Sequence, residues 1–589
     1  MRTQGCTPCV RSFFEGSRSG LAYADVVVLF DCSGAMVDIV PSRSERCGAQ
    51  MQVSQLPALN DSAEVGWSYL PLGTSVPLMD ADGITVGQRL ALAARRHPTR
   101  NAIVWIEDAE VRGVTWGDLF ERASVIGEHL RHTHPSNSRV GILGRDRLQW
   151  IQAFYGAACA GFGVVPLPND GADTVARCCG AVGVDLILGT DDVGVRAKEL
   201  GDVRLVRIGS VPTAGVPSYG MDAVVAGPAG PFLYQFTSGT TGRPKVAVLS
   251  HRAVLGAAAG YALATGACDG DSMFNPLPLE HVGGSVAGLL GALSIDGTYV
   301  SVDRFDAVDI AQVVRNAAPS VVGLVPTMLI DLLDRGVVRP SDFASVSSIV
   351  GGATSVDPAL IDRVEAELGI RFLVGYGQSE APCLTVSGVD DPAVLRTRTI
   401  GRPLPGRDYC IASKGSVVRD GEVGELCVRG PLIMSGYLTE GGDIAQVTDE
   451  NGWMRTGDLC SMSEGIITFH SRLRDVVIRG GENLYPAEIE SVVLEYPGVQ
   501  DVAVFGAPDA RLGEVPAAAV ICGADSALDF ADLDRFVAER LPRKKRPTQW
   551  FPVGDFPRTS TGKARKAELA ERLLTRVVDE VPQSPDIVN

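Results

Sequence analysis

The sequence predicts an α/β protein with a large N-terminal domain of doubly wound sheets plus a small β-rich subdomain, followed by a small α+β C-terminal domain. Three observations lead to this prediction. The chain has 589 residues, more than one hydrophobic core usually serves. Strand and helix patterns alternate up to about Val350, as in parallel sheets with helical crossovers. Beyond Ile400 the strands become short and punctuated by glycine, and an α+β pattern follows Asp475.

The spacing of apolar residues predicts the individual elements. In chain order they are a helix over Val86–Arg96, a strand over Ala102–Ile106, a helix capped by Thr115, a strand over Arg139–Leu143, a helix over Gln149–Ala160 and a strand over Gly163–Pro168. A strand over Gly424–Val428 represents the β-rich part, and a charged helix over Lys563–Thr575 ends the pattern.

Composition sets the first residues apart. Met1–Gln50 mixes Arg, Ser, Gly and cysteines around one apolar stretch, Leu21–Phe30, which Asp25 interrupts, so a signal peptide is disfavoured. We expect residues 1–50 to be largely disordered, or to precede a true start near Met51. The predicted units are a leader over 1–82, a large domain over 83–473, a small domain over 474–576 and a tail over 577–589.

Charge and composition exclude several functions. Lys and Arg total 53 against 70 Asp and Glu, giving a net charge of -17, so nucleic acid is not an expected partner. No apolar run approaches the roughly 18 residues of a spanning helix, so we expect a cytoplasmic protein without integral membrane association. The 13 scattered cysteines fit reduced thiols. Cys6 and Cys9 have redox or metal spacing, but no second pair follows at a zinc-site interval.

The strongest motif runs over residues 234–245, YQFTSGTTGRPK, where an apolar strand enters a loop of hydroxyls and glycines. Glycines let backbone N–H groups approach a polyphosphate, hydroxyls add donors, and a lysine supplies charge. Pro244 stands in place of a glycine of the Walker A loop, so the spacing differs from that motif. The predicted phosphate-binding residues are Thr237, Ser238, Gly239, Thr240, Thr241, Gly242 and Lys245.

This order of residues resembles the phosphate loop of the acyl-adenylate-forming enzymes, which include acyl-CoA synthetases, peptide-synthetase adenylation domains and beetle luciferase. The resemblance covers about residues 83–575 and is greatest to the acyl-CoA synthetases. It implies ATP, Mg²⁺ and CoA as cofactors or co-substrates, and a C-terminal domain that is mobile.

The resemblance also implies the other nucleotide contacts. Residues 350–354, VGGAT, resemble the adenine-binding strand end, and residues 375–380, GYGQSE, supply a ring that stacks on adenine, a phosphate-binding hydroxyl and the Mg²⁺ ligand Glu380. Residues 453–459 resemble the ribose clamp, in which the aspartate accepts hydrogen bonds from two hydroxyls. The implied residues are Gly352, Ala353, Thr354, Tyr376, Gly377, Ser379, Asp458 and Arg472.

Three further segments resemble catalytic parts of the family. Lys563, in residues 556–563, matches the lysine that stabilises negative charge between the substrate carboxylate and the α-phosphate. Arg474 stands at the hinge, with a solvated linker cation as the alternative. Gly480 and Gly481 belong to a loop in its CoA-ligase form, which would border the entrance for the thiol.

The acid itself is predicted from weaker features. His281 matches the histidine on the carboxylate side, with a buried structural histidine as the alternative. Glu280 stands where an aromatic residue is usual and could imitate the acidic residue by which amino-acid activators pair an α-ammonium group. The remaining walls, residues 321–326 and 351–353, are rich in Val and Gly and favour an apolar acid.

We therefore expect ATP-dependent activation of a fatty or cyclic acid to acyl-AMP, then transfer to CoA, giving acyl-CoA, AMP and pyrophosphate. One alternative is an adenylating enzyme that passes the acyl group to an amine or to a carrier protein, which would be a separate chain because only residues 564–589 follow Lys563. Another is a catalytically dead nucleotide-binding protein, against which Glu380, Asp458, Arg472 and Lys563 together argue. A monomer or homodimer is expected.

Overall fold

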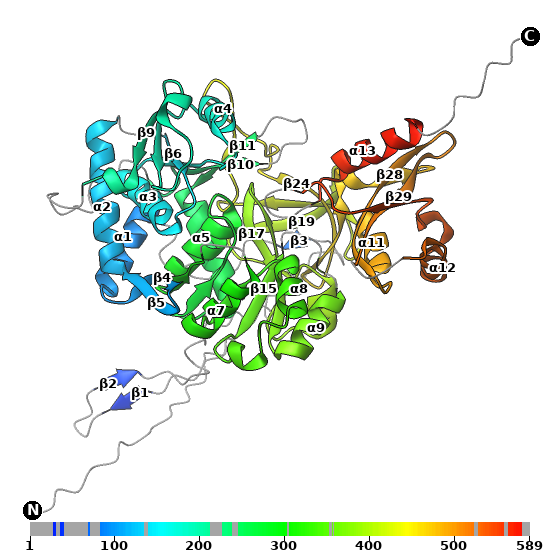
Figure 1. The fold of residues 1–589 in the computed structure, drawn as a ribbon, viewed down its shortest axis with the longest axis horizontal. Coiled ribbons are helices and arrows are strands. Elements are labelled where there is room, and N and C mark those ends of the chain that lie inside the picture. Colours follow the sequence, from blue (N-terminus) through cyan, green and yellow to red (C-terminus); the bar gives the residue numbers. More distant parts are fainter. Residues whose placement is uncertain are drawn as a thin grey trace, which may run out of the picture.

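The computed structural model describes residues 83–134, 139–212, 227–237, 245–302, 306–352, 356, 358–523, 528–558 and 564–579, together with three short strands nearer the N-terminus. These strands are β1 (Val28–Phe30), β2 (Met36–Ile39) and β3 (Tyr69–Leu70). Most described elements form one large body, and the last ones form a smaller body beside β19 and β24 (Figure 1).

An eight-stranded sheet, in the order β23-β22-β11-β10-β7-β6-β8-β9, forms one half of the large body. The strands from β10 to β9 pair in parallel, whereas β10, β11, β22 and β23 pair antiparallel. Their bounds are β6 (Arg139–Leu143), β7 (Gly163–Pro166), β8 (Leu186–Gly189), β9 (Arg204–Arg207), β10 (Pro231–Thr237), β11 (Lys245–Ser250), β22 (Gly436–Leu438) and β23 (Ile444–Ala445).

A nine-stranded sheet, in the order β18-β17-β16-β15-β14-β12-β13-β4-β5, forms the other half. It is parallel from β16 to β4, with antiparallel strands at both edges. Its strands are β4 (Asn101–Glu107), β5 (Glu110–Thr115), β12 (Ser272–Phe274), β13 (Thr298–Val300), β14 (Val321–Gly323), β15 (Ser348–Gly352), β16 (Arg371–Gln378), β17 (Ala381–Val386) and β18 (Arg402–Pro403).

Helices cover both faces of each sheet, because successive strand residues point to opposite sides. In β14, for example, Val321 packs into the central core and Val322 into the outer one. The central layer contains α1 (Val86–Arg96), α2 (Trp116–Thr133), α3 (Arg147–Ala160), α5 (His251–Ala264), the π-helix η4 (Gly283–Leu290) and α6 (Gly291–Ser294). The outer layers contain α4 (Ala172–Val182) on one side and α7 (Ala307–Ala317), α8 (Pro326–Asp334) and α9 (Pro358–Leu368) on the other.

A third, β-rich sheet leads to the C-terminal part. It consists of β19 (Asp408–Ser413), β20 (Ser416–Val417), β21 (Gly424–Arg429), β24 (Met454–Ser463) and β25 (Ile466–Arg472), with β3 paired to β19. After the turn η6 (Leu473–Asp475) follow β26 (Val477–Arg479), β27 (Glu482–Leu484), α11 (Pro486–Leu494), β28 (Val499–Asp509), β29 (Gly513–Cys522), α12 (Phe530–Arg540), β30 (Gln549–Val553) and α13 (Lys566–Asp579). The β28 and β29 strands are packed by α11 and α12 on one face and by α13 on the other.

Most predicted elements match the structure closely, and the differences have local causes. The predicted helix over Val86–Arg96 is α1, and Thr115 caps α2 by accepting a hydrogen bond from Asp118 N at 3.1 Å. The α3 helix starts earlier than predicted because the Asp146 side chain caps it, at 3.0 Å from Gln149 N. The C-terminal helix begins at Lys566, not at Lys563.

Within the predicted leader, β1 pairs with β2, and β3 adds to the edge of β19, a pairing that no sequence pattern indicated. The remaining residues of segment 1–82 and the tail beyond residue 579 lie outside the described residues, so the predictions for both stay predictions.

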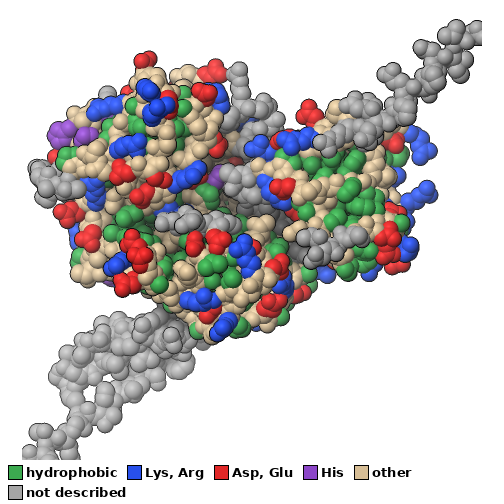
Figure 2. Space-filling view, in the orientation of Figure 1, with side chains coloured by type: hydrophobic (Ala, Val, Ile, Leu, Met, Phe, Trp, Pro, Cys, Tyr) green, Lys and Arg blue, Asp and Glu red, His purple; other side chains and the backbone are tan. Residues whose placement is uncertain are grey.

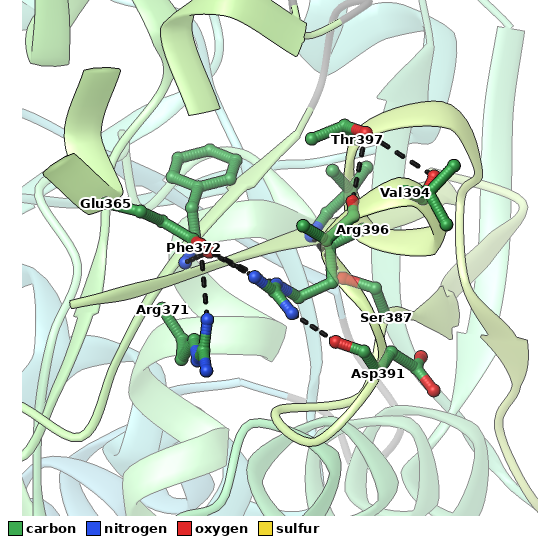
Figure 3. Close-up of polar contacts among 10 residues, drawn as sticks. Glu365, Arg371, Phe372, Ser387, Asp391, Val394, Arg396 and Thr397 are labelled. Carbon is green, nitrogen blue, oxygen red and sulfur yellow. Dashed lines mark hydrogen bonds and ion pairs between the residues drawn. The ribbon is translucent and has the colours of Figure 1, made fainter. Parts of the chain in front are cut away.

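A buried ion pair holds the start of β16 in place. Arg396, on α10 (Ala393–Arg398), is 1% exposed, and its Nη2 contacts both carboxylate oxygens of Glu365 at 2.7 Å. The Nη1 of Arg396 donates to the carbonyl of Asp391, and Glu365 also accepts a hydrogen bond from Phe372 N at 3.0 Å (Figure 3). The pair thus joins α9, α10 and β16, the strand that carries Tyr376.

Acidic and basic side chains are intermixed over the visible face, without a single basic patch (Figure 2). Among the described helices, each is too short or too polar to span a bilayer.

A buried histidine gives the fold a pH dependence. His251 is 1% exposed, stacks on Phe232 and accepts a hydrogen bond from Val86 N, and burial lowers its pKa to about 3. In the unfolded chain a histidine has a pKa of about 6.5, so below that pH only the unfolded state takes up this proton. The native state should therefore lose about 1.4 kcal/mol per pH unit as the pH falls from about 6.5 towards 3.

When the pH falls from 7 to 5, the free energy of unfolding should decrease by about 2 kcal/mol more in the unsubstituted protein than in the His251→Gln variant. Thermal midpoints at the two pH values measure this difference, with the exposed His132→Gln as the matched control. Equal acid sensitivity of His251→Gln and the unsubstituted protein would contradict the assignment.

Candidate active site

A polar cluster around the buried Asp458 joins the two large-domain segments predicted to bind the nucleoside. The hydroxyl of Tyr376, on β16, donates to Asp458 Oδ2, on β24, at 2.5 Å. Arg472 lies directly opposite Asp458 on β25, with its Nε at 3.8 Å from Asp458 Oδ1. The structure therefore brings together Tyr376, Asp458 and Arg472, three of the residues that the sequence analysis named for the nucleoside.

Local backbone features hold this cluster in place. Thr456 Oγ1 accepts from Asp458 N at 3.2 Å and donates to Leu426 O at 2.8 Å, which holds β24 where its register with β21 is irregular. Burial, and secondarily the neighbouring Asp458 carboxylate, raises the pKa of the Tyr376 phenol well above its usual value. The phenol therefore stays protonated, holds one oxygen of Asp458 and leaves the carboxylate able to accept further hydrogen bonds.

A second cluster surrounds the predicted metal ligand. Glu380 lies in the turn between β16 and β17, and its Oε1 accepts the hydroxyl of Tyr437 at 2.7 Å. The Nζ of Lys245, at the start of β11, lies 5.0 Å from the centre of the same tyrosine ring. Burial, and then the Glu380 carboxylate, raises the pKa of Tyr437. Lys245, Tyr437 and Glu380 are thus neighbours.

Two predicted glycines are explained by close backbone contacts. A Cβ on Gly377 would lie 2.6 Å from Cys383 N, across an irregular register between β16 and β17. A Cβ on Gly352 would lie 2.1 Å from Gly375 O, its partner on β16. Both residues let neighbouring strands approach closely beside Tyr376, a packing role that the sequence motif did not indicate.

The segment that leads to His281 is held by an arginine. The guanidinium of Arg147 donates to the carbonyls of Asn275, Pro276 and Leu277 at 3.1 to 3.4 Å, and also to the hydroxyl of Tyr299. The carbonyl of His281 accepts from Ser285 N at 2.9 Å, at the start of η4. His281 therefore lies between the loop that Arg147 holds and the buried helix η4.

The family of the chain follows from comparison with known proteins. The sequence model for AMP-binding enzymes matches residues 90–438, more than half of the chain, and the model for the AMP-binding enzyme C-terminal domain matches residues 488–563. This chain belongs to the AMP-binding enzyme family. The predicted family and the predicted fold class are confirmed.

Individual members of the family resemble the chain over most of its length. The methyl-dioxo-octahydroindenyl-propanoyl:CoA ligase of Rhodococcus jostii is 32% identical over 410 residues, which cover 69% of this chain and 74% of that protein. A putative acyl-CoA synthetase of Bacillus subtilis is 33% identical over 345 residues, 58% of this chain and 63% of that protein, so the match spans less than two thirds of that relative. The amide bond synthetase of Marinactinospora thermotolerans has a TM-score of 0.75 at 25% identity, covering 83% of this chain and 99% of that one.

The remaining predicted residues of this AMP-binding enzyme fall in four groups. Arg474 is 47% exposed on its side chain and lies 3.5 Å from Asp475, in the turn η6. Gly480 and Gly481 adopt positive φ angles of 59° and 84° in the turn between β26 and β27. Thr237 ends β10 and pairs with Lys245, while Ser379 lies beside Glu380. The residues outside the described part of the chain are Ser238, Gly239, Thr240, Thr241, Gly242, Ala353, Thr354 and Lys563.

Sequence reasoning missed Tyr437 and Arg147. Tyr437 lies on a strand of three residues, too short for a periodic pattern, although the Gly436-Tyr437 pair belongs to the glycine-punctuated region after Ile400. Arg147 starts a helix far from every motif and reaches its partners only through the fold.

Proposed function

We propose that this chain activates an apolar carboxylic acid with ATP and transfers the acyl group to CoA. In the first step a carboxylate oxygen of the acid attacks the α-phosphorus of ATP, and pyrophosphate leaves. In the second, the thiol sulfur of CoA attacks the acyl carbon, its proton is lost, and AMP leaves. The observation that carries the proposal is the contact of Tyr376, Asp458 and Arg472 within an AMP-binding enzyme.

In this proposal the ribose hydroxyls donate to Asp458, whose orientation is set by the Tyr376 hydroxyl at 2.5 Å. Arg472 adds a cation beside the same carboxylate. The Tyr376 ring offers its face to adenine. The Lys245 ammonium, at the end of the phosphate loop, attracts the phosphates of ATP.

Glu380 fits the proposed Mg²⁺. Mg²⁺ prefers oxygen ligands and commonly takes one or two carboxylates together with substrate phosphates. The Tyr437 hydroxyl engages one carboxylate oxygen of Glu380, and a carboxylate accepts at two. When bound, the ion would neutralise charge on the phosphates of ATP.

Lys563 is proposed to stabilise the negative charge that develops between the acid and the α-phosphate, and His281 to face the carboxylate of the acid. Gly480 and Gly481 are proposed to pass close to the acyl-adenylate, and Arg474 to act as the hinge. Ala353, Thr354 and the phosphate-loop residues 238–242 complete the proposed nucleotide site.

An apolar acid is proposed because the segments predicted to surround it, residues 321–326 and 351–353, are rich in Val and Gly. The Rhodococcus jostii relative is named as ligating a bicyclic propanoate, which agrees with this choice. A separate carrier protein or an amine is the alternative acceptor, favoured by the likeness to an amide bond synthetase at 25% identity. A cytoplasmic monomer or homodimer is proposed, because the 13 cysteines of the sequence are scattered and odd in number.

A screen of pyrophosphate release across carboxylic acids, with and without CoA, tests the function. We expect turnover with medium-chain, long-chain or cyclic apolar acids and a CoA thioester as product. Because each buried methylene contributes about 0.8 kcal/mol, its removal should weaken the acid by about fourfold until the pocket is no longer filled. The Asp458→Ala variant is the control that ties the release to this site.

Two results would redirect the proposal. Accumulation of free acyl-AMP regardless of CoA would favour the carrier or amine as acceptor. Release with polar amino acids alone would mean that Glu280 pairs an α-ammonium group, contrary to the apolar acid.

A further inference from the structure

We propose that Tyr437 is a positioning residue that serves two parts of the ATP site: its hydroxyl orients Glu380 and its ring orients Lys245. This inference rests on the proposed function. Tyr437 donates to Glu380 Oε1 at 2.7 Å, and the Lys245 Nζ lies 5.0 Å from the centre of its ring. The two contacts use different parts of one side chain, so they can be removed separately.

The pairing of β11 with β22 places the ring beside the lysine. Tyr437 lies directly opposite Ala247 in this antiparallel pair. Ala247 is two positions from Lys245, and residues two apart on a strand point to the same face. Lys245 and Tyr437 therefore project from the same side of the sheet, where a cation over an aromatic face is attracted by the ring.

Main-chain bonds fix Tyr437 relative to the metal ligand. Met434 N donates to Glu380 O at 2.8 Å, and Ser435 N donates to Val248 O at 2.8 Å. The segment that leads to Tyr437 is thus attached to the Glu380 turn on one side and to β11 on the other. With both backbones held, the hydroxyl bond selects the orientation of the carboxylate and leaves its remaining acceptor positions for a cation.

The two contacts predict separate effects on the affinity for Mg²⁺ and on the affinity for metal-free ATP. Tyr437→Phe keeps the ring but removes the hydroxyl, so it should weaken Mg²⁺ capture without changing the binding of metal-free ATP. Tyr437→Leu removes both, so it should also weaken metal-free ATP. Loss of a group that orients a metal ligand typically costs about 10-fold to 100-fold in metal affinity. Loss of a cation–ring contact should cost about threefold.

The test measures ligand binding by the full-length protein through its thermal midpoint. ATP is titrated in EDTA, and Mg²⁺ is then titrated at fixed ATP. In Tyr437→Phe, the Mg²⁺ concentration at which half of the full shift in thermal midpoint is reached should be about 10-fold higher. Its binding of ATP in EDTA should be unchanged. Tyr437→Leu should show the same Mg²⁺ loss and an about threefold weaker response to ATP in EDTA.

Two reference variants calibrate this readout. Glu380→Gln removes the proposed ligand itself and sets the largest Mg²⁺ loss. Tyr409→Phe removes another buried hydroxyl, which donates to Leu384 O at 2.8 Å and Leu404 O at 3.0 Å. This variant should have a lower midpoint without ligand, but its ATP and Mg²⁺ titrations should match those of the unsubstituted protein.

A Mg²⁺ titration of Tyr437→Phe equal to that of the unsubstituted protein would overturn the hydroxyl's role. A response of Tyr437→Leu to ATP in EDTA equal to that of Tyr437→Phe would overturn the ring's role. If Tyr437→Leu fails to fold, Tyr437→Phe still tests the metal. Failure of the unsubstituted protein to respond to ATP would instead contradict the proposed function itself.

Discussion

Replacement of Lys563 by alanine is expected to lower acid-dependent pyrophosphate exchange by about 10²-fold to 10³-fold, because a fixed cation aimed at charge that develops in the transition state contributes about that much. ATP binding should persist, since Tyr376, Asp458 and Arg472 make the nucleoside contacts proposed above. The measurement is the rate of isotope exchange between pyrophosphate and ATP, together with the thermal shift produced by ATP.

Another lysine of the C-terminal part gives this prediction its control. On either side of residues 559–563, Arg558 pairs with Ala564, and Lys566 forms an ion pair with Glu490 on α11. Lys544 is another lysine of this part, 48% exposed on its side chain and paired with Glu482. Lys544→Ala should exchange at nearly the normal rate. Undiminished exchange in Lys563→Ala would remove this lysine from the reaction.

The sequence predicted the sheets well because their residues follow a strict physical pattern. Buried strands such as Arg139–Leu143 read as short apolar runs, and the helix over Val86–Arg96 has a clear apolar spacing. By contrast, β3 is two residues long and gains its bonds from β19. No pattern within so short a segment can predict a pairing with residues about 340 positions away.

The candidate site was predictable one motif at a time, but its contacts were not. Tyr376 and Asp458 lie 82 positions apart, and Tyr437 lies 57 positions from Glu380, so each hydrogen bond depends on how two sheets meet. The sequence also indicated one reason for Gly352, the approach of a purine. The structure adds another, the contact with Gly375 O.

Replacement of Glu365 by leucine is expected to lower the free energy of unfolding by about 3–5 kcal/mol, because it leaves the buried Arg396 guanidinium without its carboxylate. Arg396 is 1% exposed and contacts both oxygens of Glu365 at 2.7 Å (Figure 3). Urea-induced unfolding, followed by tryptophan fluorescence, measures the change as a lower midpoint.

The matched control is Arg363→Met, on the same helix, α9. Arg363 pairs with Glu367 and Asp334, each at 2.7 Å, but its side chain is 37% exposed, so the loss should stay below about 1 kcal/mol. The double variant Glu365→Leu with Arg396→Met should recover much of the stability, because no unpaired charge then remains buried. If the double variant is less stable than Glu365→Leu alone, the destabilisation arises from lost packing between α9, α10 and β16 and not from the uncompensated charge.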